Sequence, residues 1–314
     1  MIATKTIRHA ASASASPKRI PSTRTDETTT VISQTRKPSP IEATIRQSVS
    51  AKVIPFILMH IACLAVFFVG ISVPAVLLCI ALYVVRMFAL TAGYHRYFAH
   101  RAFKTSRFFQ FVLAVVGTTA VQKGPLWWAA HHRMHHKYTD QEGDLHSPVT
   151  DGFWWSHIGW VISKKYDPTD WKGIKDFARY PELRWINKYH LIPAIALAVL
   201  CFLLGGWLWL VWGFVISTVL LYHGTFSVNS LAHMWGSRRY ATGDESRNNF
   251  LIALWTGGEG WHNNHHHYMA SVKQGFYWWE VDFSYYALRM MSWVRLVWDL
   301  RLPPKQLVAG APTS

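Results

Sequence analysis

The sequence has few cysteines and few charged residues. It contains three cysteines in 314 residues, Cys63, Cys79 and Cys201, and all three lie inside apolar runs. No C-x-x-C pair is present, so we expect neither a disulfide framework nor a thiolate metal site. Charged residues make up only 16% of the chain, whereas 51% of the residues are hydrophobic. This composition is too apolar for an ordinary soluble domain and predicts a membrane protein with a single functional unit.

Acidic residues are also scarce, and the chain carries a formal net charge of +15. No nucleic-acid-binding motif accompanies the charge, so we expect no nucleic-acid partner. Most of the Lys and Arg side chains are instead expected on the cytoplasmic side of a membrane, near anionic lipid. Residues 1–48 are basic and have few large apolar side chains. They are predicted to be a disordered N-terminal tail without the apolar core of a signal peptide.

The apolar residues gather in long runs that begin at Val53, Pro74 and Leu191. As one helix the third run would be roughly 48 Å long, which is too long for the ~30 Å hydrocarbon core of a bilayer. Gly205 and Gly206 interrupt it near the middle. We therefore predict four crossings in two hairpins, at about residues 53–72, 74–93, 184–204 and 207–228.

The distribution of Lys and Arg predicts the orientation of these hairpins. The two short turns carry neither residue, whereas the N-terminal tail and residues 164–188 carry many. The positive-inside rule therefore predicts a multi-pass protein with both termini and the middle segment in the cytoplasm. Arg86 is the one charge in the second run, and we expect it either to snorkel from a helix end or to pair inside the bundle.

Histidine is abundant, and its clusters flank the apolar runs. The clusters are His95 and His100; His131, His132, His135 and His136; Asn229 with His233; and His262, His265, His266 and His267. Within most clusters the spacings of three and four residues place the side chains on one face of a helix. His95 and His100 are five residues apart, about 140° around an α-helix, so we expect a helix end or a bend there.

Neutral imidazole is a ligand for zinc, copper and iron, and burying many imidazoles together is unfavourable unless they bind metal or pair. One zinc site takes about four ligands, so nine well-spaced histidines fit two metal ions. All clusters must then lie on one side of the membrane, and the short apolar run 108–122 must be a buried or re-entrant helix. His131 and His267 are extra members that could support ligands, and His60, His157, His190 and His223 are expected to make ordinary hydrogen bonds.

At these residues the chain resembles the membrane fatty acid desaturases, specifically the Δ9, stearoyl-CoA desaturase-like branch. The resemblance rests on H-x4-H at 95–100, H-x2-H-H at 132–136, N-S-x-x-H at 229–233 and G-E-G-x-H-N-x-H-H at 258–266. It implies an all-α integral membrane protein in which four transmembrane helices carry a cytosolic helical cap with a di-iron site. Residues 49–302 would form the desaturase domain, and residues 303–314 a flexible C-terminal tail.

The resemblance also implies roles for individual residues. The ligands of one iron would be His95, His100, His132, His136 and His265, and those of the other His135, His233, His262 and His266, with Asn229 acting through water. Gln122, Trp128 and Thr225 would narrow the acyl tunnel. Metal-bound imidazoles usually donate their second N–H to a carboxylate, and candidates near the clusters are Asp140, Glu142, Asp144, Glu259 and Asp282. We favour Glu259.

The implied reaction inserts a cis double bond, at Δ9, into a saturated fatty acyl chain with O2 and two external electrons. The alternative is a di-iron hydroxylase or related oxygenase; a metal transporter is disfavoured because the crossings have almost no ionisable residues. We expect the electrons to come from a separate ferredoxin, cytochrome b5 or reductase. Ala130 and His131 replace the Arg-Asp pair of animal acyl-CoA enzymes, so the carrier can be acyl-CoA, acyl-lipid or another group. Residues 275–300 suit an interfacial helix that covers the site.

Overall fold

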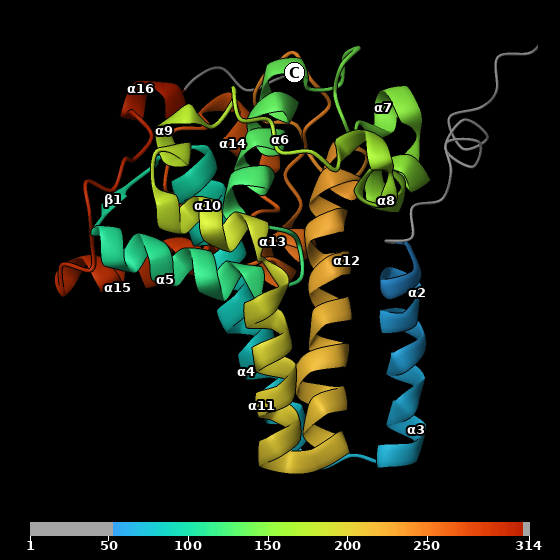
Figure 1. The fold of residues 1–314 in the computed structure, drawn as a ribbon. Coiled ribbons are helices and arrows are strands. Elements are labelled where there is room, and N and C mark those ends of the chain that lie inside the picture. Colours follow the sequence, from blue (N-terminus) through green and yellow to red (C-terminus); the bar gives the residue numbers. More distant parts are fainter. Residues whose placement is uncertain (1–52, 310–314) are drawn as a thin grey trace, which may run out of the picture. The chain divides into compact units, whose positions relative to one another are not determined.

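Two helical hairpins form the stalk of the protein (Figure 1). The computed structural model describes residues 53–309, and the tail predicted for residues 1–48 lies outside this range. The first arm of the first hairpin consists of α2 (Val53–Ala62), a 3-10 turn and α3 (Val66–Val69). Its second arm is α4 (Val73–Phe88), which runs from the foot of the stalk back toward the cap. Gly70 permits the turn with a φ of 74°, and Ser72 caps α4 by accepting a hydrogen bond from Ala75 N.

The second hairpin consists of α11 (Leu191–Trp209), a π-helical segment (Leu210–Ile216) and α12 (Ser217–Asn229). Gly205 and Gly206 have non-helical backbone angles inside the range of α11, and Gly206 has a φ of 61°. A residue with a side chain adopts such a φ only with strain. The predicted break at these two glycines is therefore confirmed.

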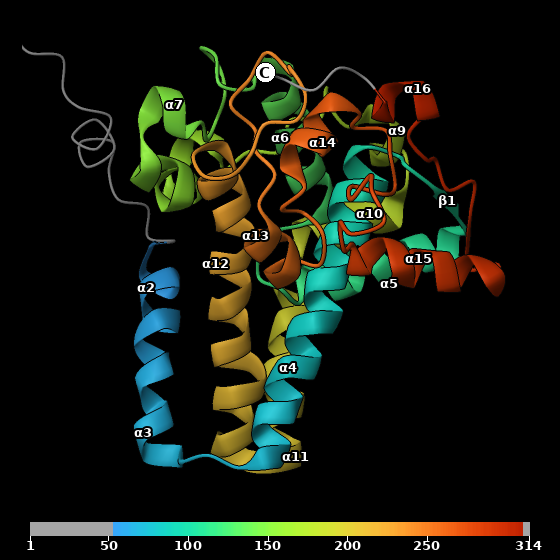
Figure 2. The ribbon, with the colours of Figure 1, turned by 180° about the vertical axis from the view of Figure 1, so that it is seen from behind.

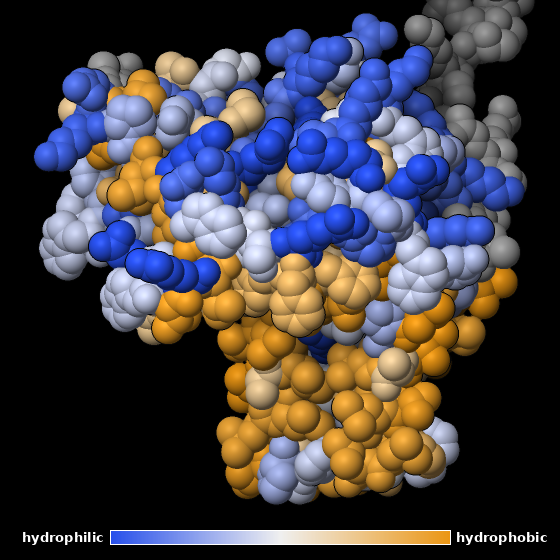
Figure 3. All heavy atoms as spheres, turned by 60° about the vertical axis from the view of Figure 1, so that its left-hand side comes forward, coloured by the Kyte–Doolittle hydropathy of each residue, from blue (hydrophilic) through white to orange (hydrophobic). Residues whose placement is uncertain are grey.

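Two helices in the described range are long and apolar enough to cross a membrane, Val73–Ala99 and Leu191–His233, and the second includes the kink at the glycine pair. The outer surface of the stalk is apolar: Phe67, Phe68 and Leu203 are 81%, 89% and 73% exposed. Figure 3 shows this hydrophobic stalk directly below a hydrophilic cap. A continuous exposed surface of large apolar side chains is suited to lipid rather than to water.

The prediction that a crossing begins near Arg184 was wrong. Residues Pro181–Lys188 form a separate helix, α10, and α11 begins only at Leu191. The side chain of Asn187 accepts hydrogen bonds from the backbone N–H groups of Leu126 and Trp127, at 3.1 and 2.9 Å. Since these N–H groups lie in the first turn of α6 (Pro125–Tyr138), α10 serves as an N-terminal cap supplied by another segment.

The remaining elements form the cap. They are α5 (Arg107–Thr118), α6, α7 (Pro148–Asp151), α8 (Trp160–Ile162), α9 (Lys175–Ala178), α10, α13 (Phe250–Trp255), α14 (His262–His267), α15 (Phe283–Trp293), α16 (Lys305–Val308) and the two-stranded antiparallel pair β1 (Lys104–Thr105) and β2 (Val297–Trp298). The rear view shows α13 and α14 beside the upper part of α12 (Figure 2). α5 has 12 residues, roughly 18 Å of helix, which is too short to cross a bilayer.

Two segments of the cap bear on the predicted boundaries. α15 lies within residues 275–300 and exposes Trp293, as suits a helix at a membrane interface. α16 lies within the segment that we predicted as a C-terminal tail. The carbonyl groups of Leu307 and Val308 accept hydrogen bonds from His267, Tyr240 and Tyr277, so this helix is tied to the cap.

Arg86 lies inside the helical bundle rather than at a helix end. Its side chain is 1% exposed and donates to the hydroxyl groups of Ser217 and Thr218 and to the carbonyl of Thr119. A buried guanidinium is tolerated when its N–H groups have acceptors, and here α12 and the end of α5 supply them. Arg86 therefore joins α4 to α12 below the cap.

Candidate metal centre

The first histidine cluster lies where α4 passes into a π-helical segment, Ala89–Ala99. The backbone N–H of His100 donates to the carbonyl of His95 at 3.1 Å, an i+5 bond. This wider winding brings residues five apart toward one face, and the two imidazole rings lie 4.8 Å apart. His100 is the C-cap of this segment, so the cluster lies at a helix end, one of the two predicted alternatives. Arg133 of α6 holds the end of the segment by donating to the carbonyls of Phe98 and Ala99.

Five histidines from three clusters meet in one group. Their ligand atoms all lie within 4.8 Å of one another; the members are His95, His100, His132, His136 and His265. The Nε2 atoms of His132 and His100 are 2.9 Å apart, and that of His265 lies 2.9 Å from that of His136. This is the set that the resemblance implied for one iron, assembled from the π-helical segment, α6 and α14.

Four further histidines form a second group by the same criterion, namely His135, His233, His262 and His266. The Nε2 atoms of His233 and His262 are 3.0 Å apart. The Nε2 atoms of His135 and His266 are buried and have no hydrogen-bond partner. This group is the set that the resemblance implied for the other iron. The backbone brings both groups to the same end of the stalk.

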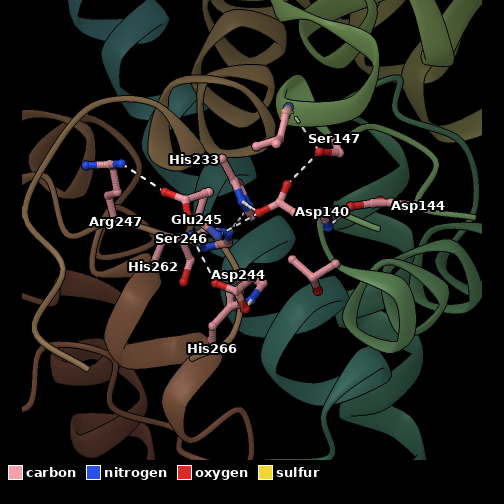
Figure 4. Close-up of polar contacts among 12 residues, drawn as sticks. Asp140, Asp144, Ser147, His233, Asp244, Glu245, Ser246, Arg247, His262 and His266 are labelled. Atoms are coloured by element: carbon pink, nitrogen blue, oxygen red, sulfur yellow. Dashed lines mark hydrogen bonds and ion pairs between the residues drawn. The ribbon is translucent and has the colours of Figure 1, made fainter. Parts of the chain in front are cut away.

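Carboxylates orient three rings of the second group, and Figure 4 shows two of these contacts. His135 Nδ1 lies 3.0 Å from Asp144, His233 Nδ1 lies 2.9 Å from Asp140, and His266 Nδ1 lies 2.9 Å from Asp244. A carboxylate only accepts, so each Nδ1 carries the proton and each Nε2 keeps a lone pair. These lone pairs point away from the carboxylates, toward the centre of the group.

Glu259 makes the corresponding contact in the first group. Its carboxylate accepts from His95 Nδ1, from Arg96 at 3.0 Å and from Gln274 at 3.0 Å. Burial opposes ionisation of Glu259, but the electrostatic interactions with His95 and Arg96 and the hydrogen bonds outweigh it and lower its pKa to about 2. The carboxylate is therefore ionised at neutral pH.

Four of the histidines are held in the neutral form. Burial, followed by the positive charge that neighbouring imidazoles would carry, lowers the pKa of His132, His136, His262 and His265 well below the usual value. The neutral imidazole is the form that ligates a metal ion. At pH 7 these four rings thus present unprotonated nitrogens to the centres of the two groups.

The arrangement fits bound metal ions. In the second group, His233 Nε2 and His262 Nε2 lie 3.0 Å apart, yet the proton of His233 is committed to Asp140. His135 and His266 add two buried nitrogens whose protons are likewise committed to carboxylates. Converging lone pairs without protons repel unless a cation lies between them. Five nitrogens in one group and four in the other are donor sets that iron, zinc or copper accepts.

The structure separates the candidate carboxylates. Asp140, Asp144 and Glu259 contact histidines of the two groups, whereas Asp282 pairs with Arg96 at 2.9 Å. Glu142 is exposed in the loop after α6. No contact between Glu142 and either histidine group is seen in residues 53–309.

Sequence reasoning missed three contributors. Asp244 holds His266 from a loop 22 residues away, and no local pattern indicates this. Gln274 supports Glu259. His146 is buried, and its ring stacks on that of His135 with centroids 4.3 Å apart. It also forms a possible metal-binding group with His135 and Asp144. The one sequence feature that could have indicated His146 is its position two residues after Asp144.

The remaining predicted residues divide between support and other roles. His131 donates to the carbonyl of Trp127 and joins neither group. His60, His223 and His157 form a hydrogen-bonded chain that ends at Ser230, as expected for histidines with ordinary partners. Asn229 lies one residue before Ser230 and lines the same cavity as His135 and His262.

This cavity has a volume of about 340 Å³ and a mostly apolar lining. It extends from the histidine groups to Phe56 and Met59 of α2. The three predicted tunnel residues all line it: Gln122 donates to Thr225 Oγ1 at 2.8 Å, and Trp128 stacks on His132 with ring centroids 5.0 Å apart. A pocket of this size and polarity suits an apolar ligand.

These features define a helical protein with an apolar stalk, in which buried histidine groups fitted to hold metal ions open onto an apolar cavity. The sequence profile of the fatty acid desaturase family matches residues 71–297. The chain belongs to the fatty acid desaturase family, which is membrane-associated and acts on fatty acyl substrates.

Relatives with different regiochemistry show similar identity. An sn-1 stearoyl-lipid 9-desaturase of Anabaena variabilis is 39% identical over 69% of this chain and 80% of its own length. An acyl-CoA C20 Delta5-desaturase of Anemone leveillei is 38% identical over 72% and 73%. A chloroplastic palmitoyl-monogalactosyldiacylglycerol delta-7 desaturase of Arabidopsis thaliana is 35% identical over 73% and 62%. These relatives thus include desaturases named for the Δ5, Δ7 and Δ9 positions.

Proposed function

We propose that the protein is a Δ9 desaturase that inserts a cis double bond into a saturated fatty acyl chain. One observation carries the proposal: the apolar cavity leads from the stalk directly to the two histidine groups. A saturated chain in this cavity would place its methylene groups beside both groups. The Anabaena variabilis relative, named as a stearoyl-lipid 9-desaturase, supports the Δ9 position.

Two iron ions would be held by the five-histidine and the four-histidine group, with Asn229 acting through water. Bound iron would supply, with O2, an oxidant strong enough to remove hydrogen from an unactivated methylene group. The residues of this chain supply position. Asp140, Asp144, Asp244 and Glu259 hold the protons of four imidazoles at Nδ1 and thereby direct the Nε2 lone pairs to the metals.

The overall reaction balances with an external source of electrons. Two C–H bonds of the chain and the O–O bond break, while one C=C double bond and two molecules of water form. The chain provides two electrons and two protons. A separate ferredoxin, cytochrome b5 or reductase would provide the other two electrons, and solvent the other two protons.

Residues of the cavity wall would select the carbons that react. The hydrogen bond between Gln122 and Thr225 joins the segment after α5 to α12 across the cavity, and Trp128 stacks on a ligand candidate, His132. A saturated chain cannot hydrogen-bond to these side chains and must follow the shape that they leave. Misplacement of a reacting carbon by 1 Å can cost on the order of 10²-fold in rate.

We further propose that the protein crosses the membrane four times, with both termini and the cap in the cytoplasm. The short turns at the foot of the stalk carry no Lys or Arg, and the cap carries many, as the positive-inside rule requires. In this topology the acyl chain enters the cavity near the membrane surface. The carrier is acyl-lipid or acyl-CoA.

Expression in cells that lack their own desaturase tests the function. Fatty-acid profiling with mapping of double bonds should show new cis-Δ9 chains for the wild-type protein and none for His262→Ala, which deletes a ligand candidate. Hydroxylated chains without an alkene would instead identify a hydroxylase. Lipid extracts and acyl-CoA pools analysed separately at early times identify the carrier by the fraction in which the double bond first appears.

A further inference from the structure

We propose that a chain of aromatic side chains, joined by two stacking contacts and one shared hydrogen-bond acceptor, carries electrons from a redox protein docked on the cap to the histidine groups. The proposal rests on the function proposed above, which requires two external electrons for each double bond. The aromatic chain consists of His267, Tyr240, Tyr277 and Trp279, and none of these four residues belongs to either histidine group.

The inner end of the aromatic chain is bound to the helix that supplies three ligand candidates. His267 directly follows His266 on α14, and its ring stacks on Tyr240 with centroids 4.0 Å apart and an interplanar angle of 7°. Tyr240 is only 2% exposed, and its backbone N–H donates to the side chain of Asn263, the neighbour of His262. Tyr240 is therefore held against α14 by its backbone and by its ring.

The middle of the aromatic chain is fixed by α16. The hydroxyl groups of Tyr240 and Tyr277 both donate to the carbonyl of Val308, at 3.0 and 3.1 Å. One acceptor thus brings the two phenols together. On its other side, Tyr277 stacks on Trp279 with centroids 4.7 Å apart and an interplanar angle of 18°. The two stacked pairs, His267 with Tyr240 and Tyr277 with Trp279, are thus joined through the shared carbonyl of Val308.

The outer end reaches the surface. Trp279 is 50% exposed, and its neighbour Trp278 is 84% exposed and touches it edge to face. Exposed tryptophans are common anchors of protein interfaces. The route from these indoles to α14 runs beside the metal ligands without entering the acyl cavity, since none of the four rings lines that cavity. Electrons and substrate would thus reach the site from different directions.

The charges near this surface indicate the kind of partner. Three basic residues belong to the segments around this surface: Lys273, which donates to the carbonyl of Phe276, Arg301, whose carbonyl accepts from Val272, and Lys305 at the start of α16. None of the ion pairs within residues 53–309 includes any of the three. The nearest acidic side chain in sequence, Glu280, is buried and paired with Arg239. The surface is therefore positive, and the partner that it fits is an acidic one-electron carrier, an iron–sulfur or haem protein. Such partners bind weakly and rapidly through small interfaces of complementary charge.

The electron balance requires two encounters for each double bond. A one-electron carrier docks at Trp279 and gives up one electron in each encounter. Two carriers therefore supply two electrons, and the substrate supplies the other two that are needed to reduce O2 to two molecules of water. The alternative role for the exposed indoles is contact with lipid headgroups, because α15 begins at Phe283 and interfacial tryptophans are common in membrane proteins.

The test measures two quantities separately: binding of the donor to the metal-free protein, and the rate at which the iron-loaded protein oxidises the donor. Reduced plant-type [2Fe–2S] ferredoxin and reduced cytochrome b5 serve as donors in parallel. Trp279→Ala should weaken binding of the oxidised donor to the metal-free protein about tenfold or more and slow donor oxidation by the iron-loaded protein. Tyr277→Leu should leave donor binding unchanged but slow donor oxidation. Tyr277→Phe, which keeps the ring, should restore most of that rate.

Two controls separate this role from a structural one. Trp154→Ala removes a tryptophan that is 63% exposed and lies just after α7, and α7 is on the opposite side of the cap from α16 (Figure 1). This variant should change neither donor binding nor donor oxidation. Dithionite reduces the metal site without a protein donor, so a single turnover started with dithionite should be equal in the wild type, Trp279→Ala and Tyr277→Leu.

Each other outcome contradicts the proposal in a distinct way. Equal loss with dithionite and with the donor would show that the rings are merely structural. If Trp279→Ala binds the donor as the wild type does but binds anionic vesicles more weakly, the exposed indoles contact lipid rather than a redox protein. Wild-type turnover with dithionite but with neither donor would exclude this class of partner. Absence of any double bond with dithionite would contradict the proposed function itself.

Discussion

His135 donates from Nδ1 to the carboxylate of Asp144 at 3.0 Å, and both side chains are almost completely buried. Asp144 also accepts from the backbone N–H groups of Asp140 and His146, so its position is fixed by the loop after α6. Burial opposes ionisation of Asp144, but the electrostatic interaction and hydrogen bond with His135, together with the backbone hydrogen bond from Asp140, lower its pKa below the usual range. The pair sets the tautomer of His135 and directs its unpartnered Nε2 toward the second histidine group.

Replacement of this carboxylate should weaken metal binding at the second group. Asp144→Asn removes the charge but keeps the shape, and loss of such a partner typically costs 10- to 100-fold in metal affinity. The iron retained against a graded series of chelator concentrations measures the effect. Glu142→Gln, two residues away on the exposed part of the same loop, is the matched control and should behave as wild type. Equal retention in Asp144→Asn would mean that the carboxylate does not support a ligand.

Replacement of two adjacent histidines on α6 should have sharply different effects on iron binding and activity. His132 belongs to the five-histidine group, whereas His131 donates to the carbonyl of Trp127 and joins neither group. His132→Ala should therefore lose bound iron and all new unsaturation. His131→Ala should keep both, with a lower melting temperature because a buried ring is removed. Iron analysis and fatty-acid profiling of the two variants decide whether the group is assigned correctly, and loss of iron from His131→Ala alone would reverse the assignment.

The bond between Gln122 and Thr225 should control where the double bond is placed. Thr225→Val removes the acceptor of a 2.8 Å hydrogen bond while keeping a similar volume. A hydrogen bond contributes about 0.5–1.5 kcal/mol, so a chain position that is disfavoured in the wild type should become roughly 2- to 10-fold more frequent. Mapping of double bonds by mass spectrometry measures the distribution of isomers. Thr225→Ser keeps the hydroxyl and should keep the wild-type product, and an unchanged distribution in Thr225→Val would remove this bond from the selection of carbons.

The metal-free protein should lose stability in mild acid. Burial lowers the pKa of His266 to about 4 and that of His146 to about 3, from an ordinary value near 6.5. Below that ordinary value the unfolded chain binds more protons than the folded one, so the free energy of unfolding falls as the pH falls, until the folded groups titrate as well. Chelator-treated protein in detergent should therefore melt at a lower temperature at about pH 5 than at about pH 7.5.

The carboxylates do not explain a change in that window. The pKa of Glu259 is lowered to about 2, so its stabilising contribution is complete above its ordinary value of 4.5 and is lost only at lower pH. A melting temperature that stays constant between the two conditions would show that the histidine groups are open to solvent in the metal-free protein. Iron-loaded protein serves as the comparison and should melt higher at neutral pH because the metal binds only the folded state.

The features that the sequence determined by itself are local ones. The apolar runs beginning at Val53 and Pro74 became a hairpin, and Gly205 and Gly206 divide the third run, because both outcomes depend on neighbouring residues alone. The spacing of the histidines on α6 and α14 indicated shared helical faces for the same reason. The division of the histidines into two groups came from the resemblance, and the geometry agrees with it.

Only the tertiary structure decided which distant groups meet. Asp140 binds His233 across 93 positions of sequence, and Asp244 binds His266 from a loop with no helical or strand pattern. α10 was predicted as part of a crossing, but its Asn187 caps α6 about 60 residues earlier in the chain. Hydrogen bonds of this kind depend on how the chain is folded back on itself, and a periodic pattern within one segment contains no information about the partner that another segment supplies.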